Sequence, residues 1–395
     1  MTAYLNALGV ICALGRDKQS VARKLFAGDC SGMRPESGWV PERILPVAAV
    51  QGELMAIPAE LSAQASRNNQ LLMEATWQIA EPIQRAIDTY GRERIGIVLG
   101  TSTSGIDEAS HGIASYLKDG HFPDGYDYQQ QELSAPATFL ADWLQLRGPA
   151  YVISTACTSS ARALMSARRL LDLGLCDAVL CGGVDSLCQL TLRGFSSLEA
   201  VSAQRCNPFS LNRNGINIGE AAVLFLMSKR ADDGPAIALL GAGASCDAHH
   251  ISAPDPTGQG AVQAMTKALK QAGLQPQDID YLNLHGTATQ HNDAMESLAV
   301  STLFPTSPPC SSTKPMTGHT LGAAGALEAA FCWLSLSTDN PCAALPPHLW
   351  DGQADPALPA LQWAQTGDTL EKRCLMSNSF AFGGNNVSLI IAEAP

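Results

Sequence analysis

Charge is scarce in this sequence, and positive charge is scarcer still. Only 16% of the 395 residues are Asp, Glu, Lys or Arg, whereas 46% are hydrophobic. The 37 acidic side chains outnumber the 25 basic ones, so the net charge at pH 7 is −12. This charge argues against binding nucleic acid or an anionic membrane over a broad surface. The hydrophobic fraction is that of a folded chain with a sizeable core, not of a disordered one.

Long uncharged hydrophobic segments are absent as well, and no secretion signal is expected. The longest apolar run, residues 321–336, contains Glu328 and is rich in Gly and Ala. It therefore predicts a buried helix rather than a membrane span. The N-terminal stretch MTAYLNALGVICALG has neither a basic start nor a cleavage site. The twelve cysteines are scattered and form no Cys-x-x-Cys pair, so we expect reduced thiols and a cytoplasmic protein.

Hydrophobic runs alternate with helical patterns along the chain, which predicts an α/β protein. After the polar segment SKRADDGP the order of elements starts again. We therefore expect two α/β halves, residues 1–232 and 233–395. Residues 104–134 and the proline-rich residues 340–361 are expected to be loops. Strands are expected over several hydrophobic ranges: 93–102, 150–155, 176–186, 221–230 and 279–287.

One cysteine, Cys157, stands between a predicted strand and a predicted helix in VISTACTSSARALM. Such a residue is commonly a small buried thiol that fills the core. A thiol at a helix N-terminus can instead feel the positive end of the helix dipole, which lowers its pKa and favours thiolate near neutral pH. The position makes Cys157 a candidate nucleophile.

Two of the eight histidines have unusual surroundings. His285 in LNLHGTATQHND follows a strand and precedes glycine, and His319 in TKPMTGHTLGAAGALEAA comes just before a Gly/Ala-rich helix. Each one alone is more commonly a structural or capping residue. The other six show no comparable context: His111, His121, His249, His250, His291 and His348.

Near the C-terminal end, NSFAFGGNN places Phe380 and Phe382 ahead of Gly383 and Gly384. This can be a tight turn between two strands. It can also be a backbone bend that directs an amide N–H toward an oxyanion, with a phenylalanine at the entrance.

Together these segments resemble the β-ketoacyl-acyl carrier protein synthases, which are decarboxylating condensing enzymes of the thiolase superfamily. The resemblance spans nearly the whole chain and includes CGGVDSL, NPFSLNRNGINIGEAA, HGTATQHNDAMES and KPMTGHTLGAAGALEA, in the family order. It implies a thiolase-like fold, in which two similar βαβαβαββ halves pack as five α-β-α-β-α layers, usually in a dimer. It also implies condensation of malonyl-carrier protein with an acyl group held on Cys157. No cofactor is implied, because the substrates arrive on the phosphopantetheine of an acyl carrier protein.

The resemblance assigns roles to individual residues. Cys157 matches the nucleophile, and the backbone N–H groups of Cys157 and Phe382 match the oxyanion hole. His285 and His319 match the pair that binds the malonyl thioester oxygen and promotes loss of carbon dioxide. Lys314 matches the lysine that supports the histidines and pairs with a carboxylate matching Glu296.

Further positions match supporting parts of the family site. Thr287 and Thr289 match hydroxyls that line the pantetheine tunnel, and Phe382 matches a gate, to which Phe380, Gly383 and Gly384 also belong. We predict no metal for this chain, although some relatives bind a structural monovalent cation. The positions matching that cation site are Asn283, Leu284, Glu328, Ser377 and Asn378.

The chain departs from the family pattern in one segment. Ser210 and Asn214 stand where Asp is more common, and Ala221 stands where Gly is more common. The loss of two carboxylates is expected to change local ion pairing. This pattern is similar to that of synthases from bacterial aryl polyene pigment clusters. Arg205 and Arg213 are candidates for contacts with the carrier protein.

Two other readings are weaker. A thiolase-type acyltransferase acting on coenzyme A would carry a second cysteine near the C-terminus, where this chain has FAFGGNN. A non-catalytic chain-length-factor subunit would lack Cys157 or the histidines, and this chain has them all. Whether the chain forms a homodimer or a heterodimer with a related subunit is left open by the sequence.

Overall fold

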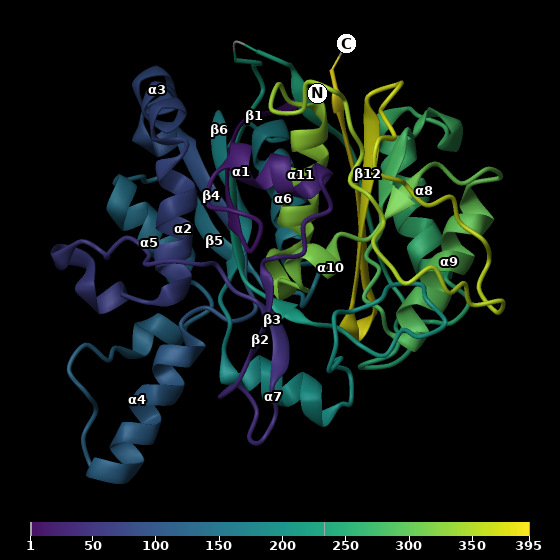
Figure 1. Cartoon of the computed structure of the whole chain (residues 1–395). Helices are drawn as coiled ribbons and strands as arrows, with labels where there is room; N and C mark the ends of the chain where they lie inside the picture. Colours follow the sequence, from purple (N-terminus) through teal and green to yellow (C-terminus); the bar gives the residue numbers. More distant parts are fainter. Residues whose placement is uncertain (1, 233, 395) are drawn as a thin grey trace.

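The hydrophobic runs form one large mixed sheet in the computed structural model, which describes residues 2–232 and 234–394 (Figure 1). Three of its central strands are buried at every position, as expected for a sheet covered on both faces. These are β6 (Ala178–Asp185), β8 (Ala221–Ser228) and β12 (Cys374–Ala381). The other strands of this sheet are β1 (Ala3–Cys12), β4 (Ile95–Gly100), β5 (Ala150–Ile153), β9 (Ile237–Cys246), β10 (Tyr281–Asn283), β11 (Cys310–Ser311) and β13 (Asn385–Glu393).

The sheet consists of two sections with the same strand order. The first section runs β1-β8-β6-β4-β5 and the second runs β9-β13-β12-β10-β11. In each, the first strand of the section pairs with its fifth, followed by the fourth, second and third. The sections meet where β1 pairs antiparallel with β9. The predicted boundary between the halves falls at residue 233, which lies outside the described residues, so its exact place stays a prediction.

Helices cover both sections and fill the space between them (Figure 1). The resulting order is helix, sheet, helix, sheet, helix, which is the five-layer arrangement implied by the resemblance. The first outer layer holds α2 (Arg67–Trp77), α3 (Ala80–Tyr90) and α5 (Ala135–Leu144); the middle layer holds α6 (Ser159–Asp172) and α11 (Ala324–Leu336); and the second outer layer holds α8 (Gln259–Ala272) and α9 (Gln290–Leu303).

The middle helix α11 is buried at each of its positions, which confirms the prediction of a buried helix in this run. In the part of the chain that the structure describes, no helix has the length and hydrophobicity to cross a membrane. The smaller elements are α1 (Lys18–Phe26), α7 (Gln189–Ser197), α10 (Lys314–Thr317) and a separate sheet of β2 (Met33–Glu36), β3 (Leu45–Ala48) and β7 (Ile218–Gly219).

Glycines let the start of α6 approach its neighbours closely. A Cβ atom on Gly100, at the end of β4, would lie 2.2 Å from the backbone nitrogen of Ser160. A Cβ atom on Gly325, in α11, would lie 2.7 Å from the Cβ atom of Ala161. Since no side chain fits at either place, the N-terminus of α6 is held tightly between a strand end and the other middle helix.

The two predicted loops have different outcomes. The proline-rich segment 340–361 contains turns and isolated bridges, as predicted. The loop prediction for 104–134 was wrong at residues 106–119, which form the helix α4 (Ile106–Asp119), whereas residues 120–127 are irregular as predicted. The segment extends away from the body of the protein (Figure 1). The rings of Tyr116, Phe122 and Tyr126 stack at centroid distances of 4.7 and 4.3 Å and support this excursion.

Candidate active site

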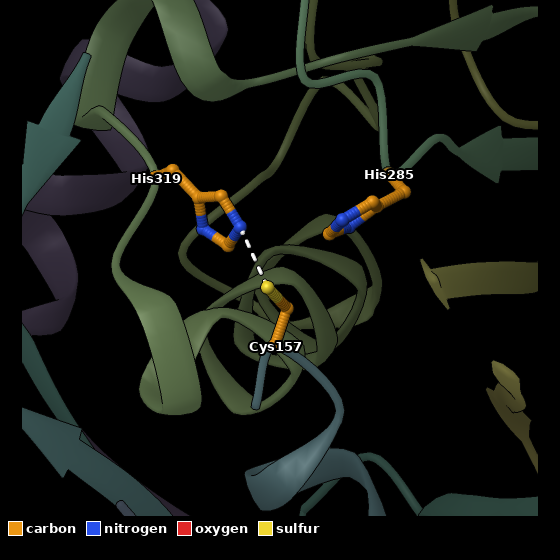
Figure 2. Close-up of side chains that lie close together, drawn as sticks. All are labelled: Cys157, His285 and His319. Carbon is orange, nitrogen blue, oxygen red and sulfur yellow. Dashed lines mark hydrogen bonds between the residues drawn. The ribbon is translucent and has the colours of Figure 1, made fainter. Parts of the chain in front are cut away.

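Cys157, His285 and His319 converge in the interior although they lie far apart in the sequence (Figure 2). The Sγ atom and one ring nitrogen of each histidine all lie within 4.8 Å of one another. The Nε2 atom of His319 is 3.1 Å from Sγ of Cys157, and the two imidazole rings meet edge to face at 5.3 Å. All three side chains are buried. The structure therefore brings together the three residues that carried the sequence hypothesis.

A strained turn between β5 and α6 presents the cysteine. Ala156 has a positive φ of 53°, which a residue with a Cβ atom adopts only at a cost of about 1–2 kcal/mol. The hydroxyl of Ser159 donates to the Ala156 carbonyl and accepts from the N–H of Thr155 at 2.9 Å. These bonds hold the turn, so Sγ is directed at the histidines rather than into the core.

The backbone around His319 fixes the tautomer of its ring. The N–H of Leu321 donates to Nδ1 at 3.2 Å, so the ring proton of neutral His319 is on Nε2, which faces Cys157. His319 can therefore donate a hydrogen bond at Nε2. The same contact makes Nε2 a poor metal ligand, although a thiol and two imidazoles are otherwise suitable donors for zinc.

His285 is held through its backbone. It follows the end of β10, and the N–H groups of His285 and Gly286 both donate to the carboxylate of Glu296 at 2.8 Å. Glu296 lies on α9 and is fully buried. The Nδ1 atom of His285 has no hydrogen-bond partner, so the ring is free to serve a substrate.

Lys314 contacts the backbone of His285, and its carboxylate partner differs from the one expected from the resemblance. Its Nζ atom donates to the His285 carbonyl and to Oε1 of Glu328, the latter at 2.5 Å. The expected pairing with Glu296 was wrong, because that carboxylate is already occupied by two backbone N–H groups. Glu328 reaches the lysine from α11, which follows α10 in the same half of the chain.

The expected thiolate of Cys157 is also corrected. Burial raises the pKa of the thiol to about 11, although Lys314 and the N–H groups of Phe382 and Cys157 lower it. The helix α6 begins at Ser159, and the loss of solvation on burial is the largest influence on the pKa of Cys157. Burial and Lys314 lower the pKa of both His285 and His319 well below the usual value. At neutral pH the site consists of a thiol and two neutral imidazoles.

The glycine pair follows β12 and forms a bend. Gly383 and Gly384 have φ values of 80° and 76°, which favour glycine. The N–H of Gly383 donates to the Ile251 carbonyl at 2.8 Å and so joins the bend to a neighbouring loop. The ring of Phe382 contacts Phe195 at 5.8 Å, and that of Phe380 lies 6.2 Å from His285.

A cavity of about 630 Å³ leads to the cysteine and the two histidines. Thr287 and Thr289 line it, and their hydroxyls are hydrogen-bonded to each other at 2.9 Å. Phe380 and Phe382 also line it. The residues expected along a pantetheine tunnel therefore share one cavity, which is large enough for a flexible arm with an acyl group.

Three residues of the expected cation site have buried oxygens without a hydrogen-bond partner. Asn283 and Ser377 are register partners on β10 and β12. The Oδ1 atom of Asn283, the Oγ atom of Ser377 and the Oε2 atom of Glu328 are buried without a hydrogen-bond partner. Oxygen donors of this kind fit a hard cation. The Asn378 side chain is engaged elsewhere, with Ser388 and Met265, and Leu284 could offer only its carbonyl group.

The segment that departs from the family pattern forms hydrogen bonds with carboxylates of the proline-rich loop. Arg213 donates to Asp355 at 2.6 Å, and Ser210 donates to Asp351 at 2.8 Å. The proline-rich loop thus supplies one carboxylate to Ser210 and another to Arg213. Arg213 is buried in this pair, so its proposed contact with a carrier protein was wrong, whereas Arg205 is exposed. Sequence reasoning missed Asp351 and Asp355, because only the fold brings this loop to the segment.

Two halves of one strand order around a buried cysteine and two histidines define a protein of the thiolase-like class. Family models match both parts: "Beta-ketoacyl synthase, N-terminal domain" at residues 7–232 and "Beta-ketoacyl synthase, C-terminal domain" at residues 237–348. The chain belongs to the β-ketoacyl synthase family.

Individual relatives agree with this. The mitochondrial 3-oxoacyl-[acyl-carrier-protein] synthase of Arabidopsis thaliana is 37% identical over 269 residues, or 62% of this chain and 57% of that protein. A Synechocystis 3-oxoacyl-[acyl-carrier-protein] synthase 2 is 30% identical over 80% of this chain and 79% of its own length. The ketosynthase ApeO from Xenorhabdus doucetiae, solved in complex with its chain length factor ApeC, is 46% identical. That match covers 100% of this chain and 98% of the other, with a TM-score of 0.94.

Proposed function

We propose that this chain is a β-ketoacyl-acyl carrier protein synthase that condenses malonyl-carrier protein with an acyl group held on Cys157. One observation carries the proposal: a buried thiol and two neutral imidazoles meet at the inner end of a single cavity. An acyl transfer followed by a decarboxylation needs these groups, and it needs water kept out.

In the first step, Sγ of Cys157 attacks the thioester carbonyl of an acyl-carrier protein. The N–H groups of Cys157 and Phe382 lie close enough to Sγ to lower its pKa, and they are placed to donate to the tetrahedral oxyanion. His319 donates to the developing thiolate through Nε2. The carbon–sulfur bond to pantetheine breaks, and the thiol proton ends on the departing pantetheine sulfur.

In the second step, the thioester oxygen of malonyl-carrier protein lies between His285 and His319. Both rings are neutral and can donate a hydrogen bond to the oxygen that gains negative charge as carbon dioxide leaves. Lys314, held by Glu328, fixes the backbone carbonyl of His285 and adds positive potential.

In the third step, the enolate carbon attacks the acyl group on Cys157. The oxyanion is again held by the N–H groups of Cys157 and Phe382, and the cysteine sulfur leaves with the electron pair of the broken bond. The product is a 3-oxoacyl-carrier protein, and the sulfur regains a proton before the next cycle. Thr287 and Thr289 guide the pantetheine arm in both half-reactions.

We place the reaction in the cytoplasm, where thiols stay reduced. We assign it no cofactor, because the steps balance with the two carrier-bound substrates and one proton from solvent, which restores the Cys157 thiol. The partner is an acyl carrier protein, with Arg205 offered as a contact for its acidic surface. The cation site is proposed as structural and takes no part in these steps.

We assign the chain to elongation of conjugated chains of the aryl polyene type. The similarity to ApeO over the full chain supports this. It also supports a heterodimer with a related chain-length-factor subunit, as two of the matched structures are ketosynthases with such a factor. Within the described residues, the edge strand β5 pairs only with β4. The apolar side chains of Tyr116 and Leu117 on α4 are exposed.

Intact-protein mass spectrometry tests the proposal. The protein, with and without a candidate partner subunit, is incubated with short saturated, long saturated and conjugated acyl-carrier proteins. Adducts that form on Cys157 only from conjugated donors support the pigment assignment, and adducts from saturated donors indicate fatty acid elongation. If no donor gives an adduct under either condition, the catalytic proposal is wrong.

A further inference from the structure

His348 lies outside the three motifs of the active site, in the proline-rich loop. It is buried and sits in an aromatic cluster: its ring stacks on Trp363 at 4.2 Å with an interplanar angle of 16°, and Trp350 and Phe209 lie at 5.7 and 6.0 Å. Burying a histidine in such a cluster costs free energy unless its ring nitrogens form hydrogen bonds.

One of those polar atoms is used. The Nδ1 atom of His348 accepts a hydrogen bond from the backbone N–H of Ser312 at 3.2 Å. Ser312 is fully buried, and its hydroxyl donates to the carbonyl of Gly286 at 2.7 Å. The same hydroxyl lies 3.4 Å from the N–H of Lys314, from which it accepts.

The backbone at Gly286 is tightly packed against these residues. A Cβ atom there would lie 2.5 Å from the Cβ atom of Ser312 and 2.9 Å from the ring of Phe209. His348 contacts both of these neighbours, one by a hydrogen bond and one by its ring. A shift of either would move Gly286 and, with it, His285.

We propose that His348 is a positioning residue for the decarboxylation half-reaction, because it fixes Ser312 and Phe209 against the backbone that carries His285. This inference rests on the proposed function. Burial lowers the pKa of His348 to about 3, so the ring stays neutral and Nδ1 keeps accepting throughout the working pH range. Cys157 is held by the turn between β5 and α6 and does not depend on this contact.

Two variants separate the hydrogen bond from the stacking. His348→Phe keeps an aromatic ring but removes Nδ1, whereas His348→Asn offers an oxygen acceptor without a ring. We expect H348F to lower kcat for carbon dioxide release from malonyl-carrier protein by roughly 10–100-fold, as for other outer residues that orient reacting groups. KM and the rate of Cys157 acylation should change by less than about twofold, and H348N should recover most of the lost kcat.

A control and a second readout keep the test decisive. Trp350→Phe alters the same aromatic cluster without touching Ser312, and it should lower the unfolding temperature but not the ratio of decarboxylation to acylation. If H348F lowers both half-reactions in parallel with stability, or lowers neither, His348 is structural only and the proposal is overturned. If none of the acyl donors acylates Cys157 of the unmodified protein, the proposed function is wrong instead. The two failures can therefore be told apart.

Discussion

At the scale of single residues, two effects act on the pKa of the Cys157 thiol in opposite directions. A nearby helix terminus lowers the pKa, and burial raises it. Burial prevails and raises its pKa to about 11. Thiolate is then the minor form at pH 7, and its fraction rises tenfold with each pH unit until the pKa is reached. The alkylation rate of Cys157 by iodoacetamide, followed by peptide mass spectrometry, should be roughly 100-fold higher at pH 9 than at pH 7. A rate that is already flat between these values would mean that the helix dipole dominates.

The two half-reactions should depend on different side chains. Cys157→Ala should abolish condensation but leave carbon dioxide release from malonyl-carrier protein, because the two imidazoles remain. His319→Ala should lower that release by roughly 100–1000-fold, the usual effect of losing one oxyanion donor, while Cys157 still accepts an acyl group. Carbon dioxide trapping and intact mass measure the two steps separately. Full condensation by C157A, or normal release by H319A, would contradict the assigned roles.

The buried ion pair of Lys314 and Glu328 should affect the free energy of unfolding strongly when only one of its two charges is removed. Glu328→Ala leaves a buried ammonium group without its counter-charge, and we expect it to lower the free energy of unfolding by about 3–5 kcal/mol. The double variant Lys314→Met, Glu328→Leu removes both charges and should regain a large part of that loss. Urea unfolding measures both. Equal stability of the single and double variants would show that the pair is not coupled.

At the scale of elements, the start of α6 determines where the nucleophile lies. Gly100→Ala would place a methyl group against the backbone of Ser160. Since backbone cannot yield as a side chain can, we expect a loss of about 1–3 kcal/mol and slower acylation of Cys157. Gly194→Ala in α7 is the matched control, because nothing lies within 4 Å of its Cβ position, and it should be neutral or slightly stabilising. Equal effects of the two changes would disprove the close-packing argument.

The same elements show how far sequence reasoning reaches. Hydrophobic runs predicted β4, β6 and β8, and the motifs predicted that Cys157, His285 and His319 share a site. The strained backbone at Ala156 has no sequence signal, because it is imposed by the surrounding turn. The helix α4 was missed although its apolar residues recur at helical spacing, since the polar and glycine-containing composition of the segment favoured a loop.

At the scale of the whole molecule, duplication explains which contacts the sequence could not reveal. The two sections repeat one strand order with no evident residue identity, so the element order alone predicted two halves. Arg213 and Asp355 meet because the fold packs segments that are 142 residues apart along the chain. Lys314 and Glu328 are only 14 residues apart, on the successive helices α10 and α11. A resemblance carries over residue types, but it misassigned the partner of Lys314 because both Glu296 and Glu328 are buried acids near the site.

At this scale we also expect the excursion around α4 to contact a second subunit. Leu117 is 80% exposed there, and Tyr116 and Ile113 on the same helix are 46% and 44% exposed, so α4 presents several apolar side chains that a second chain could cover. Leu117→Lys should therefore leave the unfolding temperature of the isolated chain within about 2 °C, because surface changes rarely exceed ±0.5 kcal/mol. It should weaken association with a chain-length-factor subunit by roughly tenfold or more, measured by sedimentation. Leu173→Lys, at a helix end with 73% exposure, is the control, and equal effects of both changes on association would place the interface elsewhere.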